Sequence, residues 1–132
     1  MHPLQQPIHK QHHSHQLTLL HLPHFHLLFT HPPTYIHQQP HTLKLTQPFI
    51  NPHLIFIPFP LFQPSIPPPL KNLFHLLPLN PLTHKILPIL PTAPSPKHYL
   101  IPQFQLKPIL PYIKAQIIQT YLFIQQQHFP PK

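Results

Sequence analysis

The sequence predicts no stable globular fold. We expect mostly irregular and polyproline II (PPII) backbone, with short marginal helices near residues 8–22, 70–77 and 112–128. Three features of the 132-residue composition lead to this expectation: 25 prolines, no glycine, and no aspartate or glutamate. Each proline removes a backbone N–H donor and disfavours helical geometry in the residue before it. Regular structure should therefore form only in short pieces, although a hydrophobic content of 41% should still drive collapse.

The missing glycine and the missing carboxylates both limit how a compact fold could close. Tight turns and helix C-caps need residues at positive φ, which glycine adopts most readily. The sequence offers Asn51, Asn72 and Asn80 as substitutes. Without Asp or Glu, side-chain salt bridges cannot form, and without Cys there are no disulfides and no thiolate metal ligands.

The absent amino-acid types share one property of the genetic code. Gly, Asp, Glu, Val, Arg, Cys and Trp never occur, and every codon for them contains guanine. Apart from Met1, Ala93 and Ala115, the whole chain can be encoded with A, C and T. The alphabet therefore indicates base composition rather than a folding or catalytic requirement. We interpret the chain as the product of a reading frame on a G-poor strand, without a selected biochemical activity.

The first two helical segments are stretches that prolines leave uninterrupted. Residues 8–22 lie between Pro7 and Pro23, although their histidine-rich first half is poorly amphipathic. Residues 70–77 carry apolar side chains at positions i, i+3, i+4 and i+7, which is the spacing of one helix face. These four are Leu70, Leu73, Phe74 and Leu77.

The third segment, residues 112–128, is open to two interpretations. Its apolar residues fall near one face of a helix, and Pro111 could start that helix. Its β-branched pair Ile117-Ile118 and its aromatic residues fit a strand almost as well.

The chain divides by composition and not by any sharp linker. We expect one low-complexity chain, rich in His and Gln over residues 1–47, rich in proline over 48–111, and poor in proline over 112–132. No stretch reaches 18 apolar residues, so we expect no transmembrane span. The sequence assigns no cellular compartment.

The histidines near the N-terminus are candidate metal ligands. Neutral imidazoles bind zinc, copper and nickel, and two histidines four residues apart share a helix face. No carboxylate exists to orient such ligands, so we expect non-selective affinity for divalent metal and no dedicated cofactor. The candidates are His9, His12, His13 and His15.

A second candidate site is a proline-rich peptide motif. Residues 85–91 match the basic-x-x-P-x-x-P pattern of SH3 ligands, and residues 91–94 spell the PTAP motif read by sorting domains. PxxP spacings are no more frequent than chance gives in so proline-rich a chain. An alternative function is nonetheless an interaction protein that presents PPII motifs to such domains. The motif residues are Lys85, Pro88, Pro91, Thr92, Ala93 and Pro94.

The net charge and the missing residue types limit the binding and catalytic functions that remain. The formal net charge is +8, all of it from scattered lysines, which allows weak binding to anionic membranes or nucleic acids but no specific nucleic-acid recognition. A carboxylate pair, a cysteine nucleophile and a glycine-rich phosphate loop are all missing. We therefore expect that the chain is not an enzyme.

Acidification should expand the chain and raise its solubility. The unperturbed pKa of an imidazole is near 6.5, so lowering the pH from 8 to 5 should add positive charge to a chain that has 16 histidines and no anionic side chain. We expect the hydrodynamic radius and the second virial coefficient from light scattering to rise over this interval. Values that stay constant would contradict the prediction.

Overall fold

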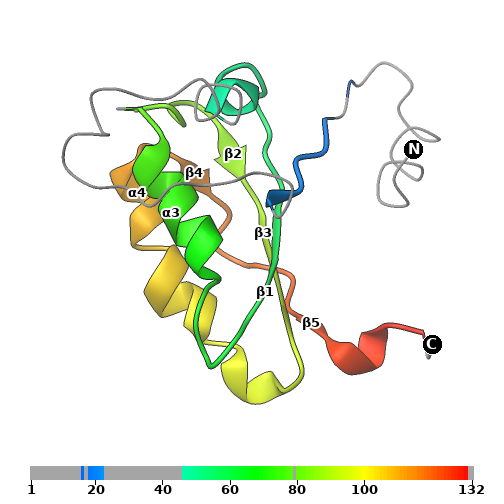
Figure 1. Ribbon diagram of the computed structural model, residues 1–132. Helices are drawn as coiled ribbons and strands as arrows, with labels where there is room; N and C mark the ends of the chain where they lie inside the picture. The colour runs from blue at the N-terminus through cyan, green and yellow to red at the C-terminus, as the bar shows by residue number, and fades with distance from the viewer. Residues whose placement is uncertain (1–15, 17, 23–45, 79, 131–132) are drawn as a thin grey trace.

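Short strands alternate with helices through the described part of the chain (Figure 1). The computed structural model describes residues 16, 18–22, 46–78 and 80–130. The strands are β1 (Ile57–Pro60), β2 (Ile86–Leu87), β3 (Ile89–Ala93), β4 (Gln116–Ile117) and β5 (Ile124–Gln125). The helices are α3 (Pro68–Leu76), η3 (Pro96–His98), the π-helix η4 (Pro102–Leu106), α4 (Ile109–Tyr112) and η5 (Gln126–His128). The expectation of a chain without a stable fold is therefore wrong.

The strands pair in parallel. β3 lies between β1 and β5, with Ile57 opposite Ile89 and Thr92 opposite Ile124, while β2 pairs with β4. Parallel strands need a crossover between them, and α3 provides the one from β1 to β2 and β3. In Figure 1, α3 and α4 lie on one side of β1 and β3.

The prolines of β1 fall on the side of the strand that does not pair with β3. The N–H of Ile57 donates to the carbonyl of Pro88 at 3.0 Å, and that of Leu61 donates to Thr92 at 2.8 Å. Successive residues of a strand point their backbone groups to opposite sides, so residues 58 and 60 face away from β3. The donors that Pro58 and Pro60 lack are thus not ones that this pairing needs.

β2 and β3 are separate strands because the proline between them faces β1, where a backbone N–H would be needed. The bridge between Leu54 and Ile86 continues in the same register as the pair Ile57 and Ile89, so β2 and β3 follow one line along β1. Pro88 lies between them, and its missing N–H falls on the side of β1. The ladder therefore stops for one residue and resumes in register.

Pro91 has the same effect on the opposite side of β3. Its backbone nitrogen faces β5, where it cannot donate, and the pairing with β5 begins only at Thr92. A proline in a central strand normally argues against the strand. Here it shortens one ladder and leaves the β1–β3 ladder intact.

The helix predicted over residues 70–77 is confirmed, with bounds one to two residues earlier. Pro68 and Pro69 occupy the first turn of α3, where their missing N–H groups are not needed. The predicted apolar stripe faces the core, and all four of its residues are buried: Leu70, Leu73, Phe74 and Leu77. They pack with Ile57 and Phe59 of β1 and with Ile89 of β3.

Prolines also shape the helical stretch before β4. The N–H of Lys107 donates to the carbonyl of Pro102, five residues back, as in a π-helix. Pro108 has no N–H to donate to the turn behind it, and its ring would crowd that turn. The wider turn removes this conflict while Leu106 and Leu110 remain fully buried.

The helix expected over residues 112–128 is not borne out. Residues 112–128 hold the end of α4, the strands β4 and β5 and the short η5, so the strand interpretation of this segment is the better one. Most of residues 8–22 lie outside the described residues. The described ones there are not helical, except for a 3₁₀ turn at Leu22.

Two buried lysines are held by backbone carbonyls and an aromatic ring. The Lys85 ammonium donates to the carbonyl of Ile50 at 2.6 Å and to that of Pro52 at 2.9 Å. The Lys107 ammonium donates to the carbonyl of Gln119 and lies 5.0 Å from the centroid of the Tyr121 ring. Burial, together with Tyr99, raises the pKa of the Tyr121 phenol.

Within the described residues, four that are not glycine adopt positive φ. Of the three asparagines that the sequence offers as substitutes for glycine, Asn80 has positive φ, at 54°, and Asn51 and Asn72 do not. The others are Gln63 (φ 46°), His84 (φ 62°) and Lys114 (φ 68°). Lys114 follows α4 in a Schellman motif, because its N–H donates to Pro111 and the next N–H donates to Leu110.

Glycine should stabilise the fold at these positions. A non-glycine residue in the left-handed region destabilises the folded chain by roughly 1–2 kcal/mol. Glycine removes this strain, but the conformational entropy that it loses on folding offsets about 0.5–1 kcal/mol of the gain. We expect Lys114→Gly and Gln63→Gly each to raise the free energy of unfolding by about 0.5–1 kcal/mol in urea titrations. Gln103→Gly, at a helical position, should lower it by a similar amount. If all three variants changed the free energy of unfolding equally, positive φ at Lys114 and Gln63 would not be a source of strain.

Candidate functional site

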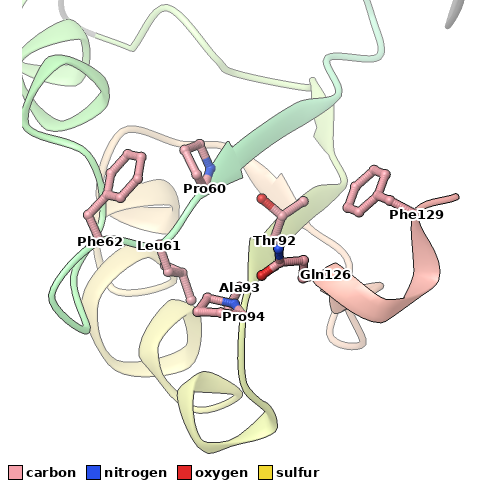
Figure 2. A pocket seen from close by; sticks show the side chains of 8 residues that line it. All are labelled: Pro60, Leu61, Phe62, Thr92, Ala93, Pro94, Gln126 and Phe129. Carbon is pink, nitrogen blue, oxygen red and sulfur yellow. The ribbon is translucent and has the colours of Figure 1, made fainter. Parts of the chain in front are cut away.

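A cavity of about 220 Å³ lies at the carboxyl ends of β1 and β3 (Figure 2). Three segments far apart in sequence form it: the end of β1 with the residues after it, the end of β3 with the residue after it, and the C-terminal η5. The lining residues are Pro60, Leu61, Phe62, Thr92, Ala93, Pro94, Gln126 and Phe129. Open parallel sheets bind ligands outside the carboxyl ends of their strands, so this cavity is the candidate site.

Aromatic rings stand at two sides of the cavity. Figure 2 shows Phe62 beyond the end of β1 and Phe129 beyond η5, with Thr92 and Ala93 between them. The exposed fractions of Phe62 and Phe129 are 62% and 54%, which is high for side chains of this kind. Two exposed rings beside an apolar cavity provide surfaces on which a flat ligand could stack.

The polar groups of the cavity are few. None of its eight lining residues carries a charge. Pro60 and Pro94 have no N–H, so their backbone offers only carbonyl acceptors. Thr92 and Gln126 supply a hydroxyl and an amide, and the Thr92 hydroxyl donates to the carbonyl of Phe59 at 3.4 Å. The cavity can therefore hold an uncharged, flat group that needs few hydrogen bonds.

A tight turn sets the position of Phe62. Phe62 and Ser65 exchange both backbone hydrogen bonds, at 3.1 and 2.9 Å, across Gln63 and Pro64. Positive φ at Gln63 followed by proline is typical of a type II′ turn, which normally has glycine at the first of these positions. This turn ends β1 and leads the chain back towards α3.

The predicted peptide motif lies within the sheet. Lys85 precedes β2, Pro88 separates β2 from β3, and residues 91–93 belong to β3. Lys85 and Ala93 are buried, and Pro91 is fully so. A peptide-reading domain could contact the buried residues Lys85, Pro91 and Ala93 only if the strand left the sheet. The last three of the motif, Thr92, Ala93 and Pro94, instead line the cavity.

The predicted metal ligands, His9, His12, His13 and His15, lie outside the described residues. Within the described part of the chain, no three histidines are close enough together to hold a metal ion. The helices described there are also too short or too polar to cross a bilayer.

Comparison with known proteins decides the family. The model of the NADPH-dependent FMN reductase family matches residues 5–129, across all three compositional segments. The chain belongs to this family.

Individual relatives agree with the family match. An NAD(P)H-dependent FAD/FMN reductase from Geobacillus thermodenitrificans (strain NG80-2) is 36% identical over 73 residues, which cover 55% of this chain and 40% of that protein. An oxidoreductase from Corynebacterium diphtheriae superposes with a TM-score of 0.63 and 25% sequence identity. The superposition covers 70% of this chain and 51% of the oxidoreductase chain. The apo form of an NADH:FMN oxidoreductase (EMOB) superposes with a TM-score of 0.61 and 23% sequence identity. The superposition covers 77% of this chain and 56% of the EMOB chain.

These likenesses establish a flavodoxin-like α/β fold. The chain spans about half the length of the proteins it matches. The interpretation as a reading frame without a selected product is wrong, because a frame of arbitrary origin would match neither a reductase family nor its fold. The expectation of a disordered chain outside any enzyme family is wrong for the same reason.

Sequence reasoning missed five lining residues of the cavity: Pro60, Leu61, Phe62, Gln126 and Phe129. A signal for the first three was present. The apolar run over residues 54–62 precedes the helix over 70–77, and a second apolar run follows over 86–93. Strand, helix and strand in this order predict a parallel unit whose carboxyl ends form a ligand site. The prolines in both runs concealed that pattern.

Proposed function

We propose that the chain binds a flavin at the cavity and serves in the reduction of that flavin by a reduced nicotinamide nucleotide. The apolar cavity between Phe62 and Phe129, at the carboxyl ends of β1 and β3, is the observation that carries this proposal. Family membership supports it, since the family is one of FMN reductases. The reduced nicotinamide nucleotide is either NADH or NADPH, because the relatives include an NAD(P)H-dependent FAD/FMN reductase and an NADH:FMN oxidoreductase.

The described residues fit the ring system of a flavin. The isoalloxazine ring is flat, apolar at its benzenoid end and able to form hydrogen bonds at its pyrimidine end. Phe62 and Phe129 suit the flat apolar part, and the Gln126 amide can both donate to and accept from the pyrimidine edge. A bound flavin would supply two-electron chemistry, as the acceptor of a hydride from the reduced nicotinamide.

The flavin phosphate would lie outside the cavity. Sites for drug-sized ligands measure about 300–1,000 Å³, so 220 Å³ accommodates the ring and not a whole nucleotide. The lining residues also offer no charge to a phosphate. The formal charge of +8, with no anionic side chain, still attracts an anionic ligand to the surface at low ionic strength.

Flavin titration tests the proposal. We expect saturable quenching of riboflavin and FMN fluorescence by the chain, with an FMN affinity that falls towards that of riboflavin as salt is added. Phe62→Ala and Phe129→Ala should each raise the Kd about 2- to 10-fold, since an aromatic contact contributes about 0.5–1.5 kcal/mol. Under anaerobic conditions, one equivalent of reduced nicotinamide should be consumed for each flavin reduced.

Phe104→Ala is the matched control. Phe104 is an aromatic side chain that is 71% exposed, like Phe62, but it lies on η4 and does not line the cavity. Its loss should leave the flavin Kd unchanged. Absence of quenching by the unaltered chain, or equal effects of the three phenylalanine variants, would contradict the proposed site.

A further inference from the structure

The side chain of Gln105 joins η4 to the loop between β1 and α3. Its amide oxygen accepts from the Ser65 hydroxyl at 2.8 Å and from the Ile66 N–H at 3.2 Å. Its amide nitrogen donates to the carbonyl of Pro64 at 3.1 Å. One side chain thus binds three consecutive residues that lie about forty positions earlier in the chain.

The bonded residues continue directly from the cavity wall. Ser65 closes the tight turn with Phe62 through two backbone hydrogen bonds, and Phe62 lines the cavity. Gln105 itself does not line it. Any displacement of Ser65 is transmitted to Phe62 across this turn, because the two residues are directly hydrogen-bonded.

The π-helix gives Gln105 its position. Leu106 and Lys107, which follow Gln105, are both buried, so the backbone on which it sits is fixed against the core. π-helical turns are rare and occur frequently at functional sites. The half-buried Gln105 side chain leaves this fixed turn towards the loop after β1.

We infer that Gln105 is a positioning residue for flavin binding: its amide holds the turn at residues 62–65 so that the Phe62 ring forms the cavity wall. This role rests on the proposed function. The amide chemistry is suited to it, because the loop presents two donors and one acceptor together. A glutamate at this position would keep the two acceptor bonds and lose the donated one, and a methionine of similar shape would lose all three.

Two measurements on Gln105→Met and Gln105→Glu test the inference. The first is hydrogen exchange of the Ile66 amide in the flavin-free protein, which should be faster in the methionine variant and close to the unaltered rate in the glutamate variant. The second is the riboflavin Kd, measured where all variants are folded. We expect it to rise for methionine by no more than the roughly 2- to 10-fold expected for Phe62→Ala, and less for glutamate.

Gln103→Met is the matched control, because Gln103 is exposed on the same π-helix. It should change neither the Ile66 exchange rate nor the riboflavin Kd. A double variant that combines Gln105→Met with Phe62→Ala should bind no more weakly than Phe62→Ala alone, because Gln105 acts through that ring.

The outcomes separate the inference from the proposed function. An unaltered chain that binds no riboflavin contradicts the proposed function and, with it, the role of Gln105. Normal binding by the unaltered chain together with an unchanged Kd in Gln105→Met overturns only the role of Gln105. Additive losses in the double variant would overturn it as well, since they would show that Gln105 acts independently of Phe62.

Discussion

The structure depends on which backbone donors the prolines remove. Ile57 and Leu61 donate backbone hydrogen bonds to the strand beside β1, while Pro58 and Pro60 face the other side. Where a proline does face a neighbour, as Pro88 faces β1, the ladder is interrupted for one residue and continues in the same register. The carboxyl ends of β1 and β3 therefore remain aligned, and that alignment brings the cavity walls together.

The lack of carboxylates has an equally direct effect on the cations. Burying an ammonium group is unfavourable unless acceptors replace its water. Lys85 binds the carbonyls of Ile50 and Pro52, and Lys107 binds the carbonyl of Gln119 and lies near the ring of Tyr121. Backbone carbonyls and an aromatic ring thus stabilise the two buried ammonium groups, as carboxylates do in other proteins. The two lysines fasten the segments before β1 and before β5 to the core.

Only part of this arrangement could be predicted from the sequence. The stripe on α3 was predictable, because side-chain spacing alone defines a helix face and its prolines lie in the first turn. The strands were not, because the effect of Pro58 or Pro91 depends on which side of the strand the missing donor faces, and register sets that side. The cavity depends on the same register. The strand interpretation of residues 112–128 was available, but nothing local favoured it over a helix.

The prolines of β1 also bear on how copies of this chain would meet at high concentration. A strand lying along the side of β1 opposite β3 finds carbonyl acceptors at residues 58 and 60 but no N–H to match its own carbonyls. Exposed strand edges are templates for fibrils, and proline on such an edge is one of the devices that prevent this growth. Pro58 and Pro60 thereby disfavour edge-to-edge pairing in a chain rich in Leu, Ile and Phe.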